Sequence, residues 1–186
     1  MLLFTVALVA AGADMVSETV PQDVADRFGA KRLDGTSPTY QVRTNASNTK
    51  WILFLEGGGW CFGPNATTTI KQCGLRAGFT PLDGSFPGLD GSFPEEFGKP
   101  ADFGGLMGES CDTNPYFCEF NLAFLHYRDG ASFGGNRVDP IPMKFKNGST
   151  GAQMWMRERP IFDAVVSDLQ TRFGMAAATE VILEDG

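Results

Sequence analysis

The sequence predicts an α/β fold in which helices cover a mostly parallel β-sheet. Two short apolar runs, residues 51–55 and 121–127, have the length and composition of buried strands. A third such run, residues 180–183, follows an amphipathic helix predicted at 157–173. The order strand, helix, strand forms a βαβ unit, which requires parallel strands and almost always a right-handed crossover. These observations place the chain in the α/β class.

The N-terminal part of the chain gives weaker signals. Residues 14–32 are expected to form a short leader, with a helix within 21–32. Residues 39–44, TYQVRT, alternate in polarity and predict a strand. After the first buried strand, residues 61–73 predict a loop followed by a short helix.

The helix at 157–173 is predicted from the spacing of its apolar residues. They recur at steps of three and four, at Ile161, Phe162, Val165, Val166, Leu169 and Phe173. Pro160 fits the first helical turn, where its missing N–H has no intrahelical partner to lose. Gly174 is a plausible C-terminal stop.

Residues 74–110 are rich in Gly, Pro, Asp and Phe and are interpreted as an inserted loop. The hexapeptide LDGSFP occurs twice in this segment, at 82–87 and at 89–94. Two copies are too few for a solenoid, which needs about three repeats. We favour a duplicated loop insertion; the alternative is a lid or substrate-rim loop that exposes Phe86 and Phe93.

Composition and charge limit the classes of partner. With 186 residues, 42% of them hydrophobic and 20% charged, the chain can form one domain with its own core. The formal net charge is −7, and the sequence contains no basic stripe. This charge argues against nucleic acid and anionic membranes as partners.

The N-terminus predicts secretion. Residues 1–13, MLLFTVALVAAGA, form a short apolar run that ends in A-G-A, so we expect a signal peptide cleaved before Asp14. The alternative is an apolar first strand. The run is too short to span a bilayer, and no membrane span is expected elsewhere. Three N-x-[ST] sequons agree with secretion, at Asn45, Asn65 and Asn147.

Four cysteines, an even number, are compatible with an oxidising compartment. Their spacing favours two local disulfides, Cys61–Cys73 and Cys111–Cys118, although four cysteines allow three pairings. No metal site is expected, because these are not zinc-site spacings and the chain has one histidine.

The most specific local signal is the strand at 51–55 that runs through Glu56 into Gly57, Gly58, Gly59 and Trp60. Glycines at the end of a buried strand expose backbone N–H groups without a Cβ in the way. Such fixed donors form an oxyanion hole, and one donor contributes roughly 3–4 kcal/mol to lowering the barrier. The simpler interpretation is a tight turn that lets the chain leave the sheet.

Three blocks together resemble the pectin acetylesterase and Notum family of secreted serine carboxylesterases. They are LDGTSPTY at 33–40, KWILFLEGGGWCF at 50–62, and NPYF at 114–117 followed by NLAFLHYRDGASFGG at 121–135. Their order and rough spacing match the family over about residues 33–184. The resemblance implies an α/β-hydrolase-like sandwich and no metal or organic cofactor.

The resemblance also implies that this chain corresponds to the N-terminal half of such an esterase. In the family, a strand like 180–183 runs into a nucleophile turn of the type G-C-S-A-G-G, whereas this sequence reads Glu184-Asp185-Gly186. The nucleophilic serine, the acid and the histidine are therefore expected to be missing from residues 14–186. We accordingly expect this polypeptide alone to be inactive.

The implied activity is hydrolysis of O-acyl, most simply acetyl, groups on an extracellular polysaccharide through a serine acyl-enzyme. The net charge of −7 is a mild objection to a polyanionic pectin. Two alternatives stay open: a Notum-like deacylase of lipidated proteins, and a non-catalytic secreted scaffold that binds glycan. A monomer in the cell wall or a similar extracellular space is expected.

Gly58 and Gly59 are the expected oxyanion-hole residues, and Gly57 and Trp60 are expected to line the substrate pocket. Glu56 is expected to accept hydrogen bonds that hold the glycine turn in shape. A core role for Trp60 is the alternative.

Residues 130–134, GASFG, match the G-x-S-x-G motif, which would make Ser132 a nucleophile. Two features oppose this. Residues 136–142 contain two prolines and predict a loop instead of the required helix, and the histidine should follow the serine, whereas His126 precedes it. We therefore expect Ser132 and Asp129 to line the site, and His126 to be a hydrogen-bonded core or rim residue.

Overall fold

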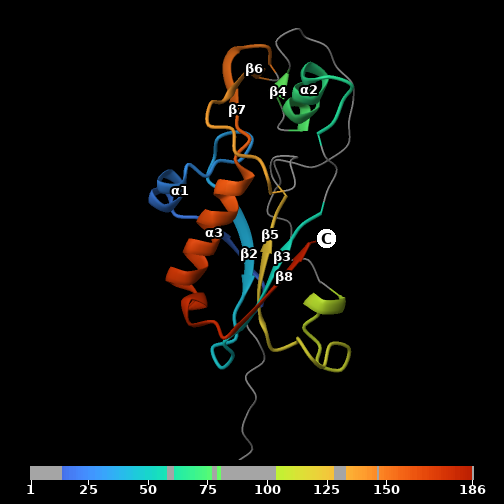
Figure 1. Ribbon diagram of the computed structural model, residues 1–186, viewed down its shortest axis with the longest axis vertical. Coiled ribbons are helices and arrows are strands. Elements are labelled where there is room, and N and C mark those ends of the chain that lie inside the picture. Colours follow the sequence, from blue (N-terminus) through green and yellow to red (C-terminus); the bar gives the residue numbers. More distant parts are fainter. Residues whose placement is uncertain are drawn as a thin grey trace, which may run out of the picture.

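In the computed structural model of this chain, a five-stranded sheet carries the main core, and a smaller three-stranded sheet lies beyond one of its ends (Figure 1). The residues that the structure describes are 14–57, 61–76, 79–80, 104–127, 133–145 and 147–185. The signal peptide expected at 1–13 and both hexapeptide copies lie outside them.

The large sheet is mixed, and its central part is parallel. Its strand order is β1–β2–β5–β3–β8. The strands are β1 (Val16–Thr19), β2 (Thr39–Arg43), β5 (Asn121–Leu125), β3 (Lys50–Leu55) and β8 (Glu180–Asp185). The pairs β5–β3 and β3–β8 are parallel, whereas β1–β2 and β2–β5 are antiparallel. The α/β class is confirmed, and the antiparallel edge comes from β1 and β2.

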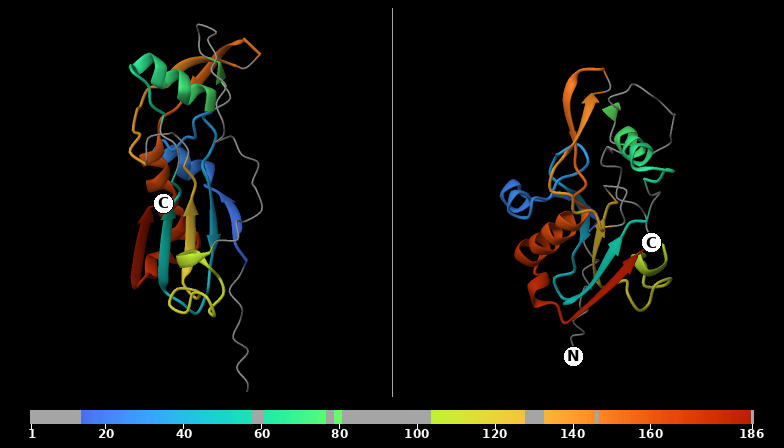
Figure 2. Two further views of the ribbon diagram at one scale, coloured as in Figure 1. Left: turned by 90° about the vertical axis from the view of Figure 1, so that its right-hand side faces the viewer. Right: turned by 45° about the horizontal axis from the view of Figure 1, so that its top comes forward.

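Helix α3 (Glu158–Arg172) covers one face of this sheet, as its apolar periodicity predicted. Its buried residues Ile161, Ala164, Val165 and Leu169 pack on side chains of β2, β3 and β5. The helix ends as predicted, because Gly174 adopts a left-handed conformation with φ of 78°. Helix α1 (Gln22–Phe28) lies beside α3 on the same side of the molecule (Figures 1 and 2).

The opposite face of the sheet is covered by the segment that leads into β5. Its apolar residues are Leu106, Met107, Phe117 and Phe120, and they pack against Ile52, Leu122 and Phe124 of the sheet. The segment includes the 3-10 helix η1 (Gly105–Met107). The predicted disulfide Cys111–Cys118 closes its loop. The two faces of the sheet are thus covered by different crossover connections.

The smaller sheet was not predicted from the sequence. It is antiparallel, in the order β4–β6–β7, and consists of β4 (Phe79–Thr80), β6 (Ile141–Phe145) and β7 (Thr150–Met154). The two prolines in residues 136–142 had suggested only a loop. Pro142 is accommodated because β4 pairs with Lys144 and Phe145 only, so β6 is an edge strand at the proline.

Helix α2 (Ala66–Arg76) packs on the smaller sheet and confirms the short helix predicted after Cys61. Asn65 begins this helix by accepting a hydrogen bond from the Thr68 N–H at 3.0 Å. The predicted disulfide Cys61–Cys73 is present, and Cys73 is buried among Met143 and Met154. In Figures 1 and 2 this unit lies beyond the carboxyl ends of β3, β5 and β8.

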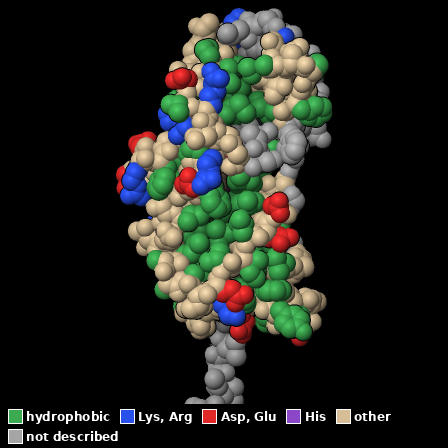
Figure 3. Space-filling model, viewed as in Figure 1, with side chains coloured by type: hydrophobic (Ala, Val, Ile, Leu, Met, Phe, Trp, Pro, Cys, Tyr) green, Lys and Arg blue, Asp and Glu red, His purple; other side chains and the backbone are tan. Residues whose placement is uncertain are grey.

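The strand at 180–183 exists as predicted, but it is not buried. Val181 is 47% exposed and Leu183 is 57% exposed. The reason is that β8 has a single neighbour, β3, and that α3 packs over β2, β5 and β3 only. Figure 3 shows hydrophobic side chains gathered over the middle of the face seen in Figure 1.

No helix within the described parts of the chain is long and apolar enough to cross a membrane.

Candidate functional site

The candidate site lies at the carboxyl ends of the neighbouring parallel strands β3 and β5. The connection that leaves β5 returns to β8 through α3 on one face, whereas the segment that arrives at β5 packs on the other face. Adjacent parallel strands whose connections lie on opposite faces leave a crevice at their carboxyl ends. Ligands bind in such crevices in open α/β sheets.

Glu56 and His126 face each other at these strand ends. They follow β3 and β5 directly, and the last paired residues of the two strands are Leu55 and Leu125. Oε2 of Glu56 lies 3.2 Å from Nδ1 of His126 and accepts a hydrogen bond of 2.9 Å from the Tyr127 N–H. The N–H of Glu56 donates to the carbonyl of Leu125 at 2.9 Å. One carboxylate therefore joins the ends of the two strands.

Aromatic rings hold the imidazole of His126 in place. The edge of the Phe124 ring meets it with centroids 5.0 Å apart and an interplanar angle of 78°. Phe54 stacks on Phe124 at 5.4 Å and 8°. The three rings lie on the face of the sheet opposite to α3. The imidazole therefore lies at the end of that apolar layer that is next to the carboxyl ends of β3 and β5.

The loop after β3 is fixed on both sides of the glycine turn. At its beginning, the carboxylate of Glu56 accepts a hydrogen bond from Tyr127 after β5. That Glu56 also accepts hydrogen bonds from the glycines stays a prediction. The far side of the loop is anchored by the disulfide Cys61–Cys73 and by the Phe62 N–H, which donates to Oε1 of Gln72 at 3.1 Å. Gly57 is placed at the carboxyl end of β3 and is exposed. Gly58, Gly59 and Trp60 lie outside the described residues.

The loop after β5 is fixed in the same way. Tyr127 anchors its beginning, and its ring lies 6.2 Å from that of Phe133, where the described chain resumes. Phe133 has a positive φ of 55°, a conformation uncommon for an aromatic residue. Asp129 and Ser132 fall between these anchors, outside the described residues. The structure therefore brings together the sequence segments predicted to form the site and does not describe five of the six residues themselves.

Sequence reasoning missed Arg157, which joins the segment after β5 to the end of α1. Its Nη1 donates to Oδ1 of Asn136 at 2.8 Å, and its Nε donates to the carbonyl of Gly29 at 2.8 Å. Arg157 is the N-cap residue of α3. A cation is electrostatically unfavourable at a helix N-terminus. An arginine at a predicted helix start was therefore the signal that could have indicated a tertiary role.

Within the described ranges, no group of three or more His, Cys, Asp or Glu side chains is arranged to hold a metal ion.

The mixed sheet with its parallel centre and the helix that covers it define an α/β-hydrolase-like fold. The crystal structure of the Wnt deacylase Notum from Drosophila has a similar fold. The TM-score is 0.66, the identity is 18%, and the match covers 93% of this chain and 43% of that chain.

The particular family follows from the sequence comparisons. A family model described as Pectinacetylesterase matches residues 10–185, so the chain belongs to the pectinacetylesterase family. Pectin acetylesterase 7 of Arabidopsis thaliana is 32% identical over 97% of this chain, and pectin acetylesterase 5 is 32% identical over 86%. The palmitoleoyl-protein carboxylesterase NOTUM of Schmidtea mediterranea is 27% identical over 73%.

The chain is shorter than these relatives. Its match spans 40% of pectin acetylesterase 7, 32% of pectin acetylesterase 5 and 22% of the Schmidtea carboxylesterase.

Proposed function

We propose that this chain carries the oxyanion-binding part of a carboxylic ester hydrolase of pectin acetylesterase type. Such an enzyme removes O-acyl, most simply acetyl, groups from an extracellular polysaccharide. The observation that carries the proposal is the position of Gly57 directly after β3, beside the end of the parallel strand β5. In the sequence, Gly58 and Gly59 follow it. The family match over residues 10–185 supports the same reaction class.

In the proposed mechanism, the N–H groups of Gly58 and Gly59 stabilise the negative charge that develops on the ester oxygen. A serine attacks the carbonyl carbon, the alcohol leaves, and water then releases the carboxylic acid from the acyl-enzyme. Gly57, Trp60, Asp129 and Ser132 line the pocket in this proposal.

The nucleophile and its partners are not proposed among residues 14–186. The only histidine, His126, precedes Ser132 in the chain and is engaged through Nδ1 with Glu56. Purified residues 14–186 are therefore expected neither to hydrolyse p-nitrophenyl acetate nor to react with a fluorophosphonate. Labelling that disappears in Ser132→Ala would overturn this part of the proposal.

The oxyanion role is tested in the complete secreted esterase with a pair of variants. Gly59→Pro removes the N–H donor, whereas Gly59→Ala retains it. If the donor acts in the transition state, the proline variant loses about 100-fold to 1,000-fold in kcat. The alanine variant should lose far less. Equal losses in the two variants would indicate a packing role for the glycine instead.

The choice of ester requires a direct comparison of substrates. The 32% identity to the Arabidopsis pectin acetylesterases favours an acetylated polysaccharide. The similarity to NOTUM favours a palmitoleoylated protein as the second candidate. Acetate release from acetylated pectin and deacylation of a palmitoleoylated peptide, measured side by side, separate them. Activity on neither substrate, without fluorophosphonate labelling, would support a non-catalytic, glycan-binding protein.

We also propose that the protein is a secreted monomer with a cleaved signal peptide at 1–13. Two disulfides support an oxidising compartment. Asn65 and Asn147 are exposed sequon residues. Asn45 is half-buried, and its Nδ2 donates to the carbonyl of Glu119 at 3.1 Å. N-terminal sequencing and deglycosylation of the secreted protein test cleavage and sequon occupancy.

A further inference from the structure

We propose that His126 is a pH-sensitive positioning residue, whose protonation strengthens the Glu56 contact that fixes the start of the glycine turn. The inference rests on the proposed function in one respect only, that this turn binds the oxyanion. His126 does not act on the substrate in this proposal. It acts through Glu56.

A hydrogen bond between His126 and an ionised Glu56 needs a proton on Nδ1 of His126. An ionised carboxylate can only accept hydrogen bonds, so the 3.2 Å contact with Oε2 of Glu56 is a hydrogen bond only if Nδ1 donates. The same Oε2 accepts the Tyr127 N–H at 2.9 Å. Glu56 is directly followed by Gly57. A change in the strength of the Glu56–His126 contact therefore acts one residue from the turn.

Protonation changes the character of this contact. A neutral imidazole has two tautomers, and only one of them carries a proton on Nδ1. In the other tautomer Nδ1 is an acceptor and cannot bind the carboxylate. With imidazolium, both ring nitrogens carry protons and the contact becomes a charge-assisted hydrogen bond, about twice as strong as a neutral one. Acidification therefore tightens the junction between β3 and β5.

The surroundings allow this response. The side chains of His126 and Glu56 are 16% and 37% exposed, so protons reach the pair while water screens it only in part. The ring also contacts Phe124, with centroids 5.0 Å apart. The other charged groups that strand register brings to this end of the sheet are Glu184 and Asp185 of β8, opposite Phe54 and Leu55.

The test uses the fact that the chain contains one histidine. The imidazole of His126 is titrated by NMR in the full folded chain between about pH 5 and 8, while the amide resonances of Gly57 and Tyr127 are followed. In the native protein both amides are expected to move in step with the imidazole. Amides that do not follow the imidazole would overturn the proposal.

Two variants separate positioning from a general effect of pH. In Glu56→Gln the Gly57 amide should no longer follow the imidazole, because the carboxylate is gone. In His126→Arg a permanently charged guanidinium replaces the imidazole. The Gly57 amide resonance should therefore keep, at every pH, the position that it has in the native protein at acidic pH. A Gly57 response that survives in either variant refutes the proposal. If Glu56→Gln does not fold, His126→Arg alone decides.

Activity provides a second readout in the complete esterase. In His126→Arg, kcat should no longer depend on the protonation of residue 126. In His126→Gln, kcat should fall about fivefold at acidic pH, whereas KM should be unchanged. A kcat that still follows the protonation in His126→Arg would contradict the positioning role. The NMR experiment does not depend on enzymatic activity. A complete protein that is inactive but shows the expected response of the amides would refute the proposed function and would still support the positioning role of His126.

Discussion

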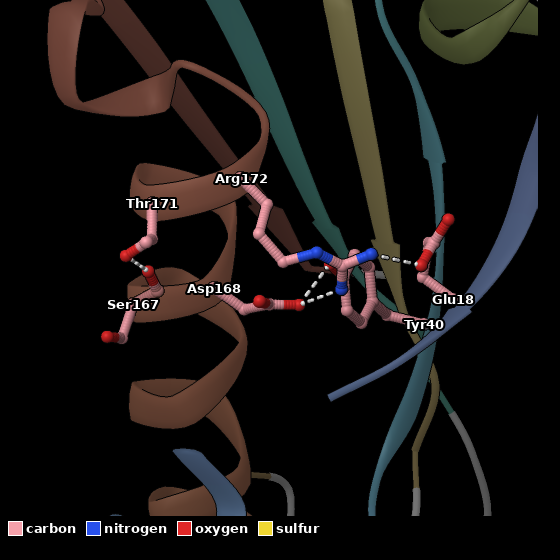
Figure 4. Close-up of polar contacts among 6 residues, drawn as sticks. All are labelled: Glu18, Tyr40, Ser167, Asp168, Thr171 and Arg172. Carbon is pink, nitrogen blue, oxygen red and sulfur yellow. Dashed lines mark hydrogen bonds and ion pairs between the residues drawn. The ribbon is translucent and has the colours of Figure 1, made fainter. Parts of the chain in front are cut away.

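Two carboxylates of this protein join separate elements, and they do so in different environments. Asp168 of α3 is 1% exposed and lies inside the core, where it meets Tyr40 of β2 and Arg172 of its own helix (Figure 4). Glu56 lies at the edge of the crevice, more than a third exposed. The first carboxylate binds two partners through one oxygen, Oδ2. The second is open to solvent and to a partner that changes charge.

The Asp168 network attaches the helix to the sheet. The hydroxyl of Tyr40 donates to Oδ2 of Asp168 at 2.7 Å, and Nη1 of Arg172 donates to the same oxygen at 3.0 Å. Nη2 of Arg172 reaches Oε2 of Glu18 on β1 at 2.6 Å. Tyr40 pairs with Leu125 at the carboxyl end of β5, but its side chain packs in the core against α3. We therefore assign the Asp168 network a structural role, whereas the Glu56–His126 pair is placed to influence the site.

The largest expected effect is that of Asp168→Ala. The substitution leaves the Tyr40 hydroxyl and the Arg172 guanidinium without their shared partner, one of them fully buried. Leaving a buried donor without a partner costs about 1–3 kcal/mol, and the Arg172 contact is lost as well, so we expect a loss of about 3 kcal/mol in the free energy of unfolding. Urea denaturation measures it.

Asp163→Ala is the matched control on the same helix. Asp163 pairs with Arg159 at 3.1 Å, and both side chains are well exposed. Such a pair contributes about 0.5 kcal/mol or less. Similar losses for Asp163→Ala and Asp168→Ala would show that the network of Figure 4 does not hold the helix on the sheet.

Tyr40→Phe is expected to cost about 1–2 kcal/mol at neutral pH, because it removes one buried hydrogen bond to a charged acceptor. It should also change the alkaline behaviour. Burial, followed by the hydrogen bond to Asp168, raises the pKa of Tyr40 above its ordinary value. In the unfolded chain the tyrosine ionises near pH 10.

The sign follows from proton binding. Above about pH 10 the folded protein holds the Tyr40 proton and the unfolded chain releases it, so stability is full below that pH and falls as pH rises, by up to about 1.4 kcal/mol per pH unit. Tyr40→Phe should remove this slope. Tyr116→Phe should not, because Tyr116 is 81% exposed. Equal alkaline slopes in the two variants would contradict burial of Tyr40.

Periodicity and spacing predicted the elements that depend on neighbouring residues. The strands β2, β3 and β5, the helix α3 and both disulfides follow from such local patterns. The exposure of β8 was predicted wrongly, because an apolar composition cannot tell an edge strand from a central one. The strands β6 and β7 form a local hairpin, and they escaped prediction because the prolines in residues 136–142 are typical of a loop.

The Asp168 network could not be predicted from the sequence, because Tyr40 and Asp168 are 128 residues apart. One signal was present, however. Asp168 occupies the buried stripe of α3 between Val165 and Leu169, and an acid on an apolar stripe requires a buried partner. The partner itself could not be named from one sequence. The Glu56–His126 pair was closer to prediction. Glu56 directly follows the predicted strand 51–55, and His126 lies in the predicted strand 121–127, which ends two residues earlier in the structure, at Leu125.

Glu56→Gln is expected to cost only about 1 kcal/mol in stability, in contrast to Asp168→Ala. The amide oxygen of glutamine can still accept the Tyr127 N–H, and the exposed part of the side chain stays hydrated. Its effect should instead appear at the glycine turn. Hydrogen exchange of the Gly57 amide, compared with that of Leu169 in the core, measures this local loosening. Equal changes at the two amides would mean that Glu56 supports the whole fold and not the site.

The smallest expected effect is that of Glu18→Gln, at the solvent-facing end of the Asp168 network. The side chains of Glu18 and Arg172 are 26% and 37% exposed, and their hydrogen bond is the main cause that raises the pKa of Arg172. A pair this accessible contributes about 0.5 kcal/mol and is weakened by salt. Urea denaturation at low and at about 1 M salt should therefore show a difference between native and variant that shrinks as salt is added. A difference unchanged by salt would mean that Glu18 is as well shielded as Asp168, and that the network is uniformly buried from the core to β1.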